Sequence, residues 1–494
     1  MNSFLWGVAT SGYQAEGGFN GAGEPQTNWA RAEREGDVAP LGQSADFWHR
    51  YKEDFKRCRT LGLNAFRLSI EWSRVQPTQI DRAGEPPPFD REALDRYAAM
   101  ILSCMENGLE PVVTLHHFVH PAWLGSDPWL NSTTPARFRD YVRTVVAHVN
   151  ARLPRPIHWF ITLNEPNMLV LNSYFGHQFP SRAKGGLRTM ALAFTQLLRA
   201  HLLAYNVLHD LYGERGWPAP AVSFNNYCSD FYWTDKLLLD LACARERGVT
   251  REKLAAYIHE KATQFDAAFR VARLPLHKDL AYYFGAVAKR LGNWVGYQKF
   301  SVQPFDTFLD ELYASPRERV LDYIGLDYYD PFMAHVFRLP VVWDHEFKNR
   351  SFRSWVLATV TNKWWDWRVL PRGLYFFCRH YAEDFCRPVL IAENGMALRR
   401  SGDGRKPRRD RMTRSEFLRL HVGEVARLLQ DGVPLAGYLH WSLFDNYEWG
   451  TYTPRFGLYS IDFNRGAERE AEDPDGDRPA ETYATLIREL SLRP

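Results

Sequence analysis

Eight short apolar runs of strand length recur along this chain and alternate with longer amphipathic stretches. Several runs are apolar at consecutive positions, as in Val112-Val113 and Val389-Leu390-Ile391. Such continuous runs are typical of parallel strands that are covered on both faces. The stretches 136–153, 189–208 and 415–429 between them have the patterning of helices. The eight runs are Phe4 to Thr10, Ala65 to Ile70, Pro111 to His117, His158 to Asn164, Ala221 to Tyr227, Asp322 to Tyr329, Pro388 to Asn394 and Leu435 to Leu443.

This alternation predicts an α/β fold, a single (β/α)8 TIM barrel with elaborated βα loops. No repeat period or low-complexity linker divides the sequence, so we expect one barrel domain over residues 1–494. Polar and aromatic residues close five of the runs at their C-terminal ends. They are Thr-Leu-His-His at 114–117, Asn-Glu-Pro at 164–166, Asp-Tyr-Tyr at 327–329, Glu-Asn-Gly at 393–395 and Trp-Ser-Leu at 441–443. Barrel enzymes build their active sites at that face, and we therefore expect a site there.

Composition excludes several other classes of protein. The 61 Lys and Arg residues against 58 Asp and Glu residues give a net charge of +3, which supplies no general field for nucleic acid or a membrane. The first residues show no leader pattern, and no apolar run is long enough for a membrane span. The six cysteines are scattered without a Cys-x-x-Cys pair and predict reduced thiols. We therefore expect a cytoplasmic protein. Aromatic residues make up 15% of the chain. A core absorbs many of them, but the 17 Trp also suit a protein that stacks on flat apolar faces of a ligand, sugars among them.

Five motifs, in order from residue 4 to residue 449, resemble those of family 1 glycoside hydrolases, the β-glucosidase family. The two with carboxylates are Ile161-Thr162-Leu163-Asn164-Glu165-Pro166 and Ile391-Ala392-Glu393-Asn394-Gly395. The other three are Phe4 to Gly17, Phe66 to Arg74 and Gly437 to Trp449. The resemblance covers the whole chain and implies a retaining exo-β-glycosidase that acts on terminal β-D-glucosides, with tolerance of β-fucosides or β-galactosides. Its partners would be small β-glycosides or oligosaccharides, and it would need neither a metal nor an organic cofactor.

The resemblance also implies the roles of four catalytic residues. Glu393 corresponds to the nucleophile and Glu165 to the acid/base. Breaking an acetal needs two carboxyl groups in opposite protonation states, about 5–5.5 Å apart for retention. Arg67 would hold Glu393 ionised by charge and bidentate hydrogen bonding, and Tyr329 would donate a hydrogen bond to it. Glu165 should lie in a less hydrated environment than Glu393, with fewer cations nearby.

The substrate-binding residues follow from the same resemblance. Residues matching those that bind the hydroxyl groups of the terminal sugar are Gln14, His117, Asn164, Glu448 and Trp449. Trp441 corresponds to the platform beneath the sugar ring, Phe456 to an aromatic residue of that pocket and Trp367 to the lining of the aglycone mouth.

Three residues depart from the usual family pattern. Phe118 replaces a Trp after the pocket histidine, and Asn167 follows Glu-Pro where many relatives have a bulkier residue. Asp327 replaces the Asn of Asn-Tyr-Tyr, and we expect it to add a negative charge near Glu165 or to accept hydrogen bonds.

Two other kinds of site are weaker interpretations. His116 and His117 point to opposite faces of a strand, so with His120 they make a poor metal site. The stretch Arg399 to Arg414 holds seven Arg and one Lys, but no aromatic residue for base stacking. We expect a solvated loop there rather than a nucleic-acid site.

Other glycosidase functions also remain as alternatives. A 6-phospho-β-glycosidase of the same family would have a smaller residue at 448 and a lysine after Leu458; Glu448 stands here, and no lysine follows. A sugar-binding relative with weak catalysis, or a thioglucosidase, typically lacks one glutamate, whereas Glu165 and Glu393 are both present.

Overall fold

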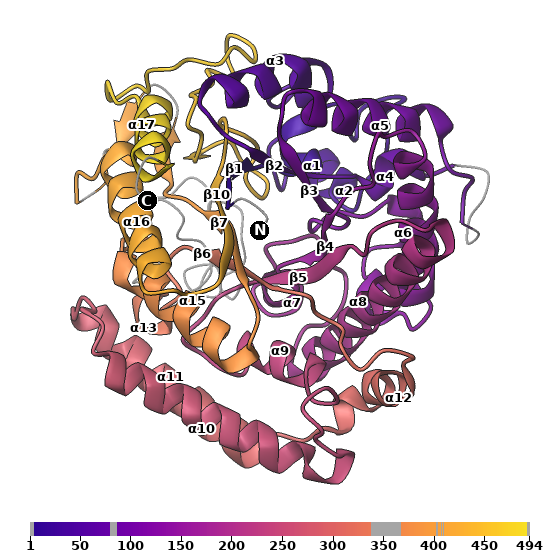
Figure 1. Cartoon of the computed structure of the whole chain (residues 1–494), viewed down its shortest axis with the longest axis vertical. Helices are drawn as coiled ribbons and strands as arrows, with labels where there is room; N and C mark the ends of the chain where they lie inside the picture. The colour runs from indigo at the N-terminus through magenta and orange to yellow at the C-terminus, as the bar shows by residue number, and fades with distance from the viewer. Residues whose placement is uncertain are drawn as a thin grey trace.

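The eight predicted strands form one closed parallel barrel in a computed structural model that describes residues 4–79, 86–336, 367–401, 404–406, 408 and 410–491 (Figure 1). Around the barrel the strand order is β1-β10-β7-β6-β5-β4-β3-β2. The strands are β1 (Leu5–Ala9), β2 (Ala65–Ser69), β3 (Glu110–Thr114), β4 (Trp159–Asn164), β5 (Ala221–Tyr227), β6 (Ile324–Tyr328), β7 (Val389–Asn394) and β10 (Leu435–Trp441). The prediction of a (β/α)8 barrel is confirmed.

Helices surround the barrel and cover its outer face. Those before β5 are α1 (Gly12–Glu16), α2 (Ala30–Glu35), α3 (Phe47–Thr60), α4 (Trp72–Val75), α5 (Arg91–Glu106), α6 (Thr134–Asn150), α7 (Pro166–Tyr174) and α8 (Leu187–Arg215). Those after it are α9 (Lys236–Ala242), α10 (Leu254–Ala272), α11 (Leu280–Lys299), α12 (Asp306–Ala314), α13 (Met333–Val336), α15 (Pro371–Phe385), α16 (Arg414–Gln430) and α17 (Pro479–Ser491). Short 3-10 turns occur at Ala122–Leu124, Pro128–Leu130, Arg251–Lys253 and Gln303–Phe305.

The three helices named from sequence are confirmed, with shifted ends. Helix α8 extends to Arg215 because its apolar stripe continues through Leu211 and Tyr212, which are buried. Helix α16 begins after Thr413, whose side chain accepts a hydrogen bond from the Glu416 backbone, while the Glu416 side chain accepts one from Thr413 in a capping box. The ends of these helices therefore depend on tertiary packing and on capping, which the hydrophobic periodicity of the sequence does not report.

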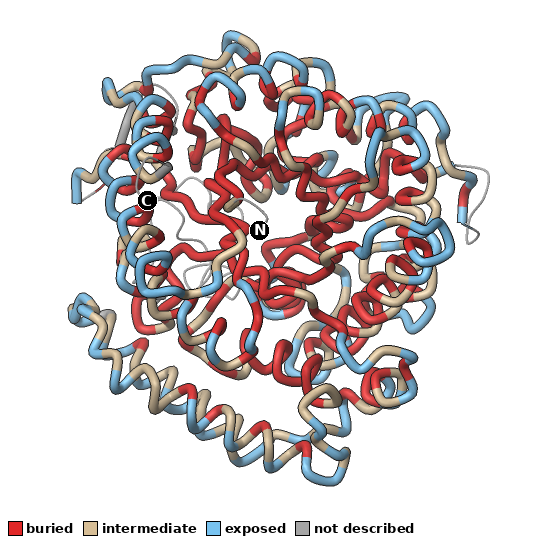
Figure 2. Tube along the Cα trace, viewed as in Figure 1, coloured by how far each residue is buried: buried red, intermediate tan, exposed pale blue. Residues whose placement is uncertain are grey.

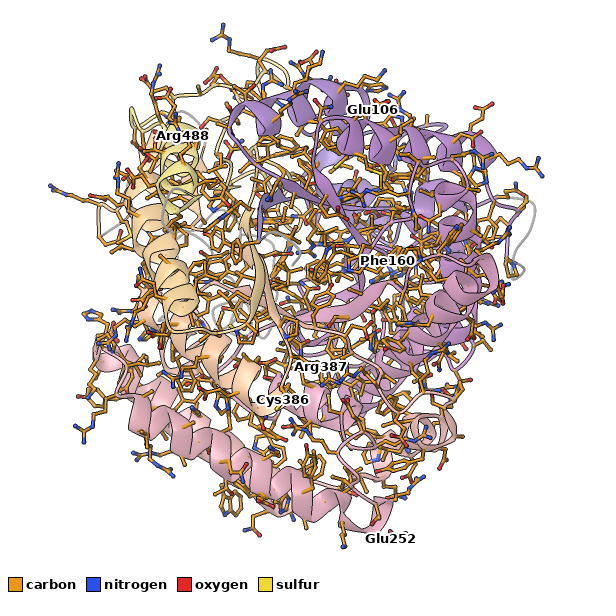
Figure 3. The ribbon with its side chains drawn as sticks, viewed as in Figure 1. Glu106, Phe160, Glu252, Cys386, Arg387 and Arg488 are labelled. Carbon is orange, nitrogen blue, oxygen red and sulfur yellow. The ribbon has the colours of Figure 1, made fainter. Side chains whose placement is uncertain are left out.

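The core lies in and around the barrel strands, which are mostly red in Figure 2, whereas the outer faces of the helices are exposed. In Figure 3, Phe160 of β4 lies at the centre of the molecule, and Glu106 and Arg488 lie on its periphery. All six cysteines are free thiols, and only Cys386 among them is exposed. None of the helices within the described ranges combines the length and the apolar character needed to cross a bilayer.

The arginine-rich stretch 399–414 differs from the solvated loop that we expected. It contributes β8 (Leu398–Ser401) and β9 (Gly404–Lys406) to a small antiparallel sheet with β11 (Pro454–Arg455). Arg408 and Arg414 are buried: Arg408 donates to the carbonyl of Trp367 at 2.5 Å, and Arg414 donates to that of Arg455 at 2.7 Å. Backbone carbonyls thus accept hydrogen bonds from both guanidinium groups, and the Asp410 carboxylate also pairs with Arg408 at 2.8 Å. The side chains of 399–407 and 409 lie outside the described residues.

The longest connection between barrel strands runs from β5 to β6 and contains α9, α10, α11 and α12. Helices α10 and α11 lie outside the ring of barrel helices, along the lower left edge of Figure 1. They pack on each other through Asp266 of α10, which accepts a hydrogen bond from Asn293 of α11 at 2.9 Å.

Candidate active site

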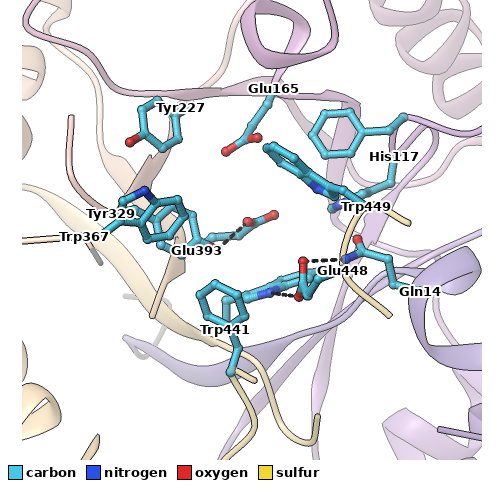
Figure 4. Close-up of a pocket in the computed structure, with 12 residues that line it drawn as sticks. Gln14, His117, Glu165, Tyr227, Tyr329, Trp367, Glu393, Trp441, Glu448 and Trp449 are labelled. Carbon is cyan, nitrogen blue, oxygen red and sulfur yellow. Dashed lines mark hydrogen bonds between the residues drawn. The ribbon is translucent and has the colours of Figure 1, made fainter. Parts of the chain in front are cut away.

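The C-terminal ends of the barrel strands converge on one cavity (Figure 4). Its lining residues are Gln14, His117, Phe118, Glu165, Tyr227, Tyr329, Trp367, Glu393, Trp441, Glu448, Trp449 and Phe456. Of the twelve site residues expected from sequence, the ten other than Arg67 and Asn164 line this cavity. Arg67 and Asn164 are buried behind it and bond to Glu393 and His117, respectively.

Glu165 is placed by the junction between β4 and α7. Asn164 is the last residue of β4, and Pro166 is the first residue of α7, where its fixed φ suits the first turn of a helix. Proline also disfavours the helical region for the residue before it. Glu165 has φ 39° in the left-handed region, and its carboxyl group points into the cavity. The Asn-Glu-Pro sequence thus fixes both the strand end and the direction of the glutamate.

Glu393 on β7 receives a hydrogen bond on each carboxylate oxygen. Arg67 donates to Oε1 at 2.7 Å and Tyr329 donates to Oε2 at 2.8 Å. The expected bidentate contact from Arg67 is wrong, because the guanidinium of Arg67 is shared among several acceptors. Its other nitrogens donate to Thr114 at 2.9 Å and to Asn164 at 2.5 Å. The second bond to Glu393 therefore comes from the tyrosine.

Three carboxyl groups lie close together at this site. One oxygen from each of Glu165, Asp327 and Glu393 lies within 4.8 Å of the other two. Burial and the negative charge of Glu393 raise the pKa of Glu165 well above its ordinary value. Burial also raises the pKa of Glu393, but Arg67 and Tyr329 oppose that effect. Since its two donors stabilise the charged form, Glu393 is the first of these groups to ionise.

Asp327 is fully buried beside both glutamates. Asn225 at the end of β5 donates a hydrogen bond to Asp327 Oδ2, and the other oxygen, Oδ1, lies 4.0 Å from the Arg67 guanidinium. Burial and the charges of Glu393 and Glu165 raise the pKa of Asp327 well above its ordinary value. One expectation for this departure is confirmed, since Asp327 accepts a hydrogen bond from a neighbour. The other expectation, a negative charge beside Glu165, is opposed by the raised pKa of Asp327.

The carboxyl groups of Glu165, Asp327 and Glu393 also lie close enough together to be ligands of a metal ion. The Arg67 guanidinium already contacts Glu393 and lies 4.0 Å from Asp327. A divalent cation between these oxygens would lie next to a permanent positive charge in a buried site. The donor set therefore fits a metal poorly.

Polar side chains form the wall of the cavity on the side of β1 and β10. Glu448 accepts hydrogen bonds from Trp441 Nε1 and from Gln14 Nε2, both at 3.0 Å. Burial raises the pKa of Glu448 well above its ordinary value. The ring of His117 stacks on Trp441 with centroids 5.6 Å apart, and its Nδ1 finds no hydrogen-bond partner among the described residues. Burial, together with Arg67, lowers the pKa of His117, so its neutral ring can still bond a hydroxyl group.

Aromatic rings form the other walls. Tyr329 lies between Trp367, at a centroid distance of 4.7 Å, and Tyr227, at 6.1 Å and nearly parallel. Phe456 lies 6.0 Å from both Tyr329 and Trp367. These flat apolar faces beside polar groups suit a ligand such as a sugar, which has both kinds of surface.

Sequence reasoning missed Tyr227 and Asn225. Both belong to Asn225-Asn226-Tyr227, which closes β5 as the recognised polar groups close the other strands. This polar end of β5 was the sequence feature from which both residues could have been predicted. Asn167, one of the departures, donates from its side chain to the Tyr227 carbonyl at 2.7 Å and so supports this tyrosine. Phe118, another departure, lines the cavity and contacts Trp449 edge-on at 5.7 Å.

The three clustered histidines occupy different surroundings, as the strand geometry predicted. His117 lines the cavity, whereas His116 packs behind it with Trp129, at a centroid distance of 5.0 Å. Burial and His120 lower the pKa of His116 well below its ordinary value. His116 and His120 therefore behave as neutral core residues.

Proteins of known function and structure resemble this chain over nearly its full length. β-Glucosidase A of Thermotoga maritima is 28% identical, with 93% of each chain covered, and β-glucosidase 25 of Oryza sativa subsp. japonica is also 28% identical, with 94% of this chain and 90% of the relative covered. A 6-phospho-β-galactosidase of Clostridium acetobutylicum is 25% identical, with 95% of this chain and 94% of the relative covered.

The fold is shared with a solved structure of a family 1 β-glucosidase from Thermotoga maritima, which has a TM-score of 0.68, 23% identity and coverage of 100% of this chain and 99% of the other. The sequence model of glycosyl hydrolase family 1 matches residues 1–229 and 287–474. This match takes in all eight barrel strands and every residue of the cavity described above. The chain belongs to glycosyl hydrolase family 1.

Proposed function

We propose that this hydrolase removes terminal β-D-glucosyl groups from the non-reducing ends of glycosides by a retaining double displacement. The observation that carries the proposal is the pair of glutamates: Glu393, held by Arg67 and Tyr329, faces Glu165, whose pKa is raised. Their nearest oxygens lie within 4.8 Å. Oxygens this close support a retaining pair, whose carboxyl groups are about 5–5.5 Å apart, rather than an inverting pair at roughly 6.5–9.5 Å.

In the first step, a carboxylate oxygen of Glu393 would attack the anomeric carbon while the bond from that carbon to the leaving oxygen breaks. Glu165 would transfer its proton to the leaving oxygen. In the second step, water would attack the same carbon, Glu165 would take a proton from that water, and the bond to Glu393 would break. Tyr329 and Arg67 keep Glu393 ionised between turnovers by stabilising its negative charge.

The sugar would occupy the polar end of the cavity. Gln14, His117, Asn164, Glu448 and Trp449 are the groups we assign to its hydroxyls. Trp441 would lie beneath the ring, and Phe456 and Trp367 would line the way to the aglycone. Buried polar groups that lose their partners are costly, so analogues lacking a bonded hydroxyl should bind much more weakly. We expect glucosides to be preferred, with β-fucosides or β-galactosides accepted.

A 6-phosphoglycoside is the second candidate substrate, because a 6-phospho-β-galactosidase is among the relatives. Glu448 bonds to Trp441 and Gln14 in the polar wall, and none of the described cavity-lining residues is Lys or Arg. A phosphate would therefore meet a carboxyl group without a compensating cation. Assays with aryl β-glucoside and its 6-phosphate should show hydrolysis of the first and little of the second.

Glu165→Ala provides the sharpest test of the two carboxyl roles. Dinitrophenolate departs without a proton, so a dinitrophenyl β-glucoside should still form the glycosyl-enzyme. That intermediate should then accumulate, because no base activates water. Azide needs no deprotonation and should restore turnover with β-glucosyl azide as the product, whereas cellobiose should stay nearly inert.

Glu393→Ala is the matched variant, since it removes the other carboxyl group. It should fold but retain less than about 1% of the wild-type turnover, and azide should not give a β-azide. Equal losses on both substrates for Glu165→Ala, without azide rescue, would contradict the acid/base role.

We also infer that residues 1–494 act as one catalytic domain in the cytoplasm. Free thiols at all six cysteines support a reducing compartment. Neither catalytic step described above requires a cofactor.

A further inference from the structure

Helix α11 exposes large apolar side chains along one face. Leu280, Tyr283, Val287, Leu291 and Trp294 are each between 57% and 71% exposed. Their spacing of three or four residues places them within about 100° of one another around the helix. Val271, at the end of α10, is 81% exposed as well. A contiguous apolar face of this kind on a globular protein marks an interaction surface.

The opposite face of α11 contains glycines and is the one that packs on the protein. A Cβ atom at Gly285, Gly292 or Gly296 would approach Ala334, Phe231 or Trp233 to 2.6, 2.9 and 2.3 Å, respectively. An ordinary surface helix buries its large apolar residues and exposes polar ones. Here small residues allow close packing inside while large apolar residues point outward, so the outer face has a role other than stabilising the barrel.

The same region carries a concentrated positive charge. Residues 270–299 include six Lys or Arg and a single acidic residue, Asp279, which is paired with Arg368. The segment's net charge of +5 therefore exceeds the +3 of the whole chain. Lys289 is paired with Asp230. The remaining basic residues, all exposed, are Arg270, Arg273, Lys278, Arg290 and Lys299.

The family model matches this region only in part. It does not match residues 230–286, which contain α9, α10 and the first turns of α11, whereas the rest of α11 lies within the match. The cavity-lining residues lie elsewhere in the chain, so catalysis does not explain the exposed face.

We propose that the outer face of α11 docks on the surface of an anionic lipid bilayer. Trp, Tyr and Leu side chains on one face of a helix with flanking Lys and Arg are suited to the interface between headgroups and acyl chains. Basic residues near such a surface add attraction to anionic lipids. The helix would lie in the plane of the membrane and would not cross it, in keeping with the lack of a spanning helix among the described residues.

Self-association fits the charge pattern less well. A twofold contact between two copies would bring the same basic residues together, and like charges across an interface oppose binding. The apolar face is also smaller than the roughly 20–30 residues a side of a standard protein interface. An anionic surface complements both the apolar and the basic groups.

The test is flotation of the full-length protein with vesicles of phosphatidylcholine, either alone or with about one third phosphatidylglycerol. Wild type should float with the anionic vesicles in low salt and much less at about 0.5 M salt, where charges are screened. The double variant Leu291→Ser, Trp294→Ser should bind at least about tenfold more weakly. Its hydrolysis of a soluble aryl β-glucoside should be unchanged, because neither residue lines the cavity.

A matched control replaces two exposed leucines elsewhere, Leu187→Ser and Leu420→Ser, and should bind vesicles as the wild type does. The proposal is overturned if wild type does not bind anionic vesicles, or if the two double variants bind equally. Concentration-dependent dimerisation in light scattering that only Leu291→Ser, Trp294→Ser abolishes, without vesicle binding by wild type, would assign the face to a second copy.

Discussion

At the scale of single residues, Asp327 distinguishes this site from a simple pair of glutamates. It is buried, bonded by Asn225, and within 4.8 Å of oxygens from both Glu165 and Glu393. The positive charge of Arg67 lies next to this group of three carboxyl groups, at 2.7 Å from Glu393 and 4.0 Å from Asp327. When such groups interact strongly, protons leave the group as a whole in steps, and loss of the last proton is opposed by charges already present. The pKa of Asp327 is raised well above its ordinary value, and its hydrogen bond to Glu165 lowers the pKa of that glutamate. Asp327 should therefore limit activity at high pH.

We expect Asp327→Ala to shift the alkaline limb of the kcat/KM profile to higher pH. The variant removes a hydrogen bond that lowers the pKa of Glu165, so Glu165 would keep its proton to higher pH. The pH dependence of aryl β-glucoside hydrolysis measures this shift. Glu92→Gln, at an exposed position on α5, serves as a control and should not move the profile. An unchanged or downward-shifted limb for Asp327→Ala would contradict the coupling.

At the scale of elements, a buried polar network holds α1, which carries Gln14, against β2 and α4. The Gly12 amide donates to Ser69 at 2.6 Å, and Ser69 donates to Glu71 at 2.9 Å. Glu16, at the end of α1, accepts hydrogen bonds from Arg74 at 2.9 Å and from Tyr97 at 2.8 Å. These contacts give a physical reason for the carboxylates in two of the sequence motifs, which support the site without lining it.

Burial and the charge of Glu16 raise the pKa of Glu71 from 4.5 to about 8. Between these values the folded protein keeps a proton on Glu71 that the unfolded chain has lost, so the free energy of unfolding falls as pH rises through this window. In Glu71→Gln this loss, on the order of 3 kcal/mol, should be absent. Urea unfolding at pH 5 and pH 8 measures the difference, and the same pH slope in wild type and variant would rule out this role for Glu71.

At the scale of the whole molecule, the two ends of the sequence close the barrel together. Strand β1 pairs with β10, with Val8 opposite His440, and Tyr483 of α17 donates to the Gly7 carbonyl at 2.9 Å. The C-terminal region is also joined to α3 by two ion pairs. Arg469–Asp54, at 2.6 Å, is buried, and Arg50–Glu468, also at 2.6 Å, has its glutamate 75% exposed.

This arrangement allows a matched comparison between neighbouring ion pairs. Asp54→Ala would leave Arg469 buried without its carboxylate, at a cost of about 3–5 kcal/mol in the free energy of unfolding. Glu468→Ala would remove a solvent-screened partner and should change stability far less. Denaturant unfolding of the two variants gives the comparison, and equal losses would mean that burial does not determine the strength of the first pair.

Much of the fold and the site was predictable because their signals are local. Alternating strand-length and helical runs indicate a (β/α)8 barrel, and residues at strand ends must gather at one rim once the barrel closes. The Asn-Glu-Pro and Glu-Asn-Gly motifs end two of these strands, and their resemblance to the family motifs identified Glu165 and Glu393. The unrecognised Asn-Asn-Tyr end of β5 followed the same rule, so Asn225 and Tyr227 were within reach of the sequence.

Other features depended on contacts between distant parts of the chain. The sequence alone determined the barrel, its catalytic rim and the residue types available there. Only the tertiary structure decided that Arg67 divides its donors between Glu393, Asn164 and Thr114, and that Arg408 and Arg414 are buried on backbone carbonyls. It also decided which face of α11 remains exposed. The physical reason is that periodicity reports the direction of a side chain relative to its own element, whereas desolvation and hydrogen bonding depend on what the closed barrel brings against it.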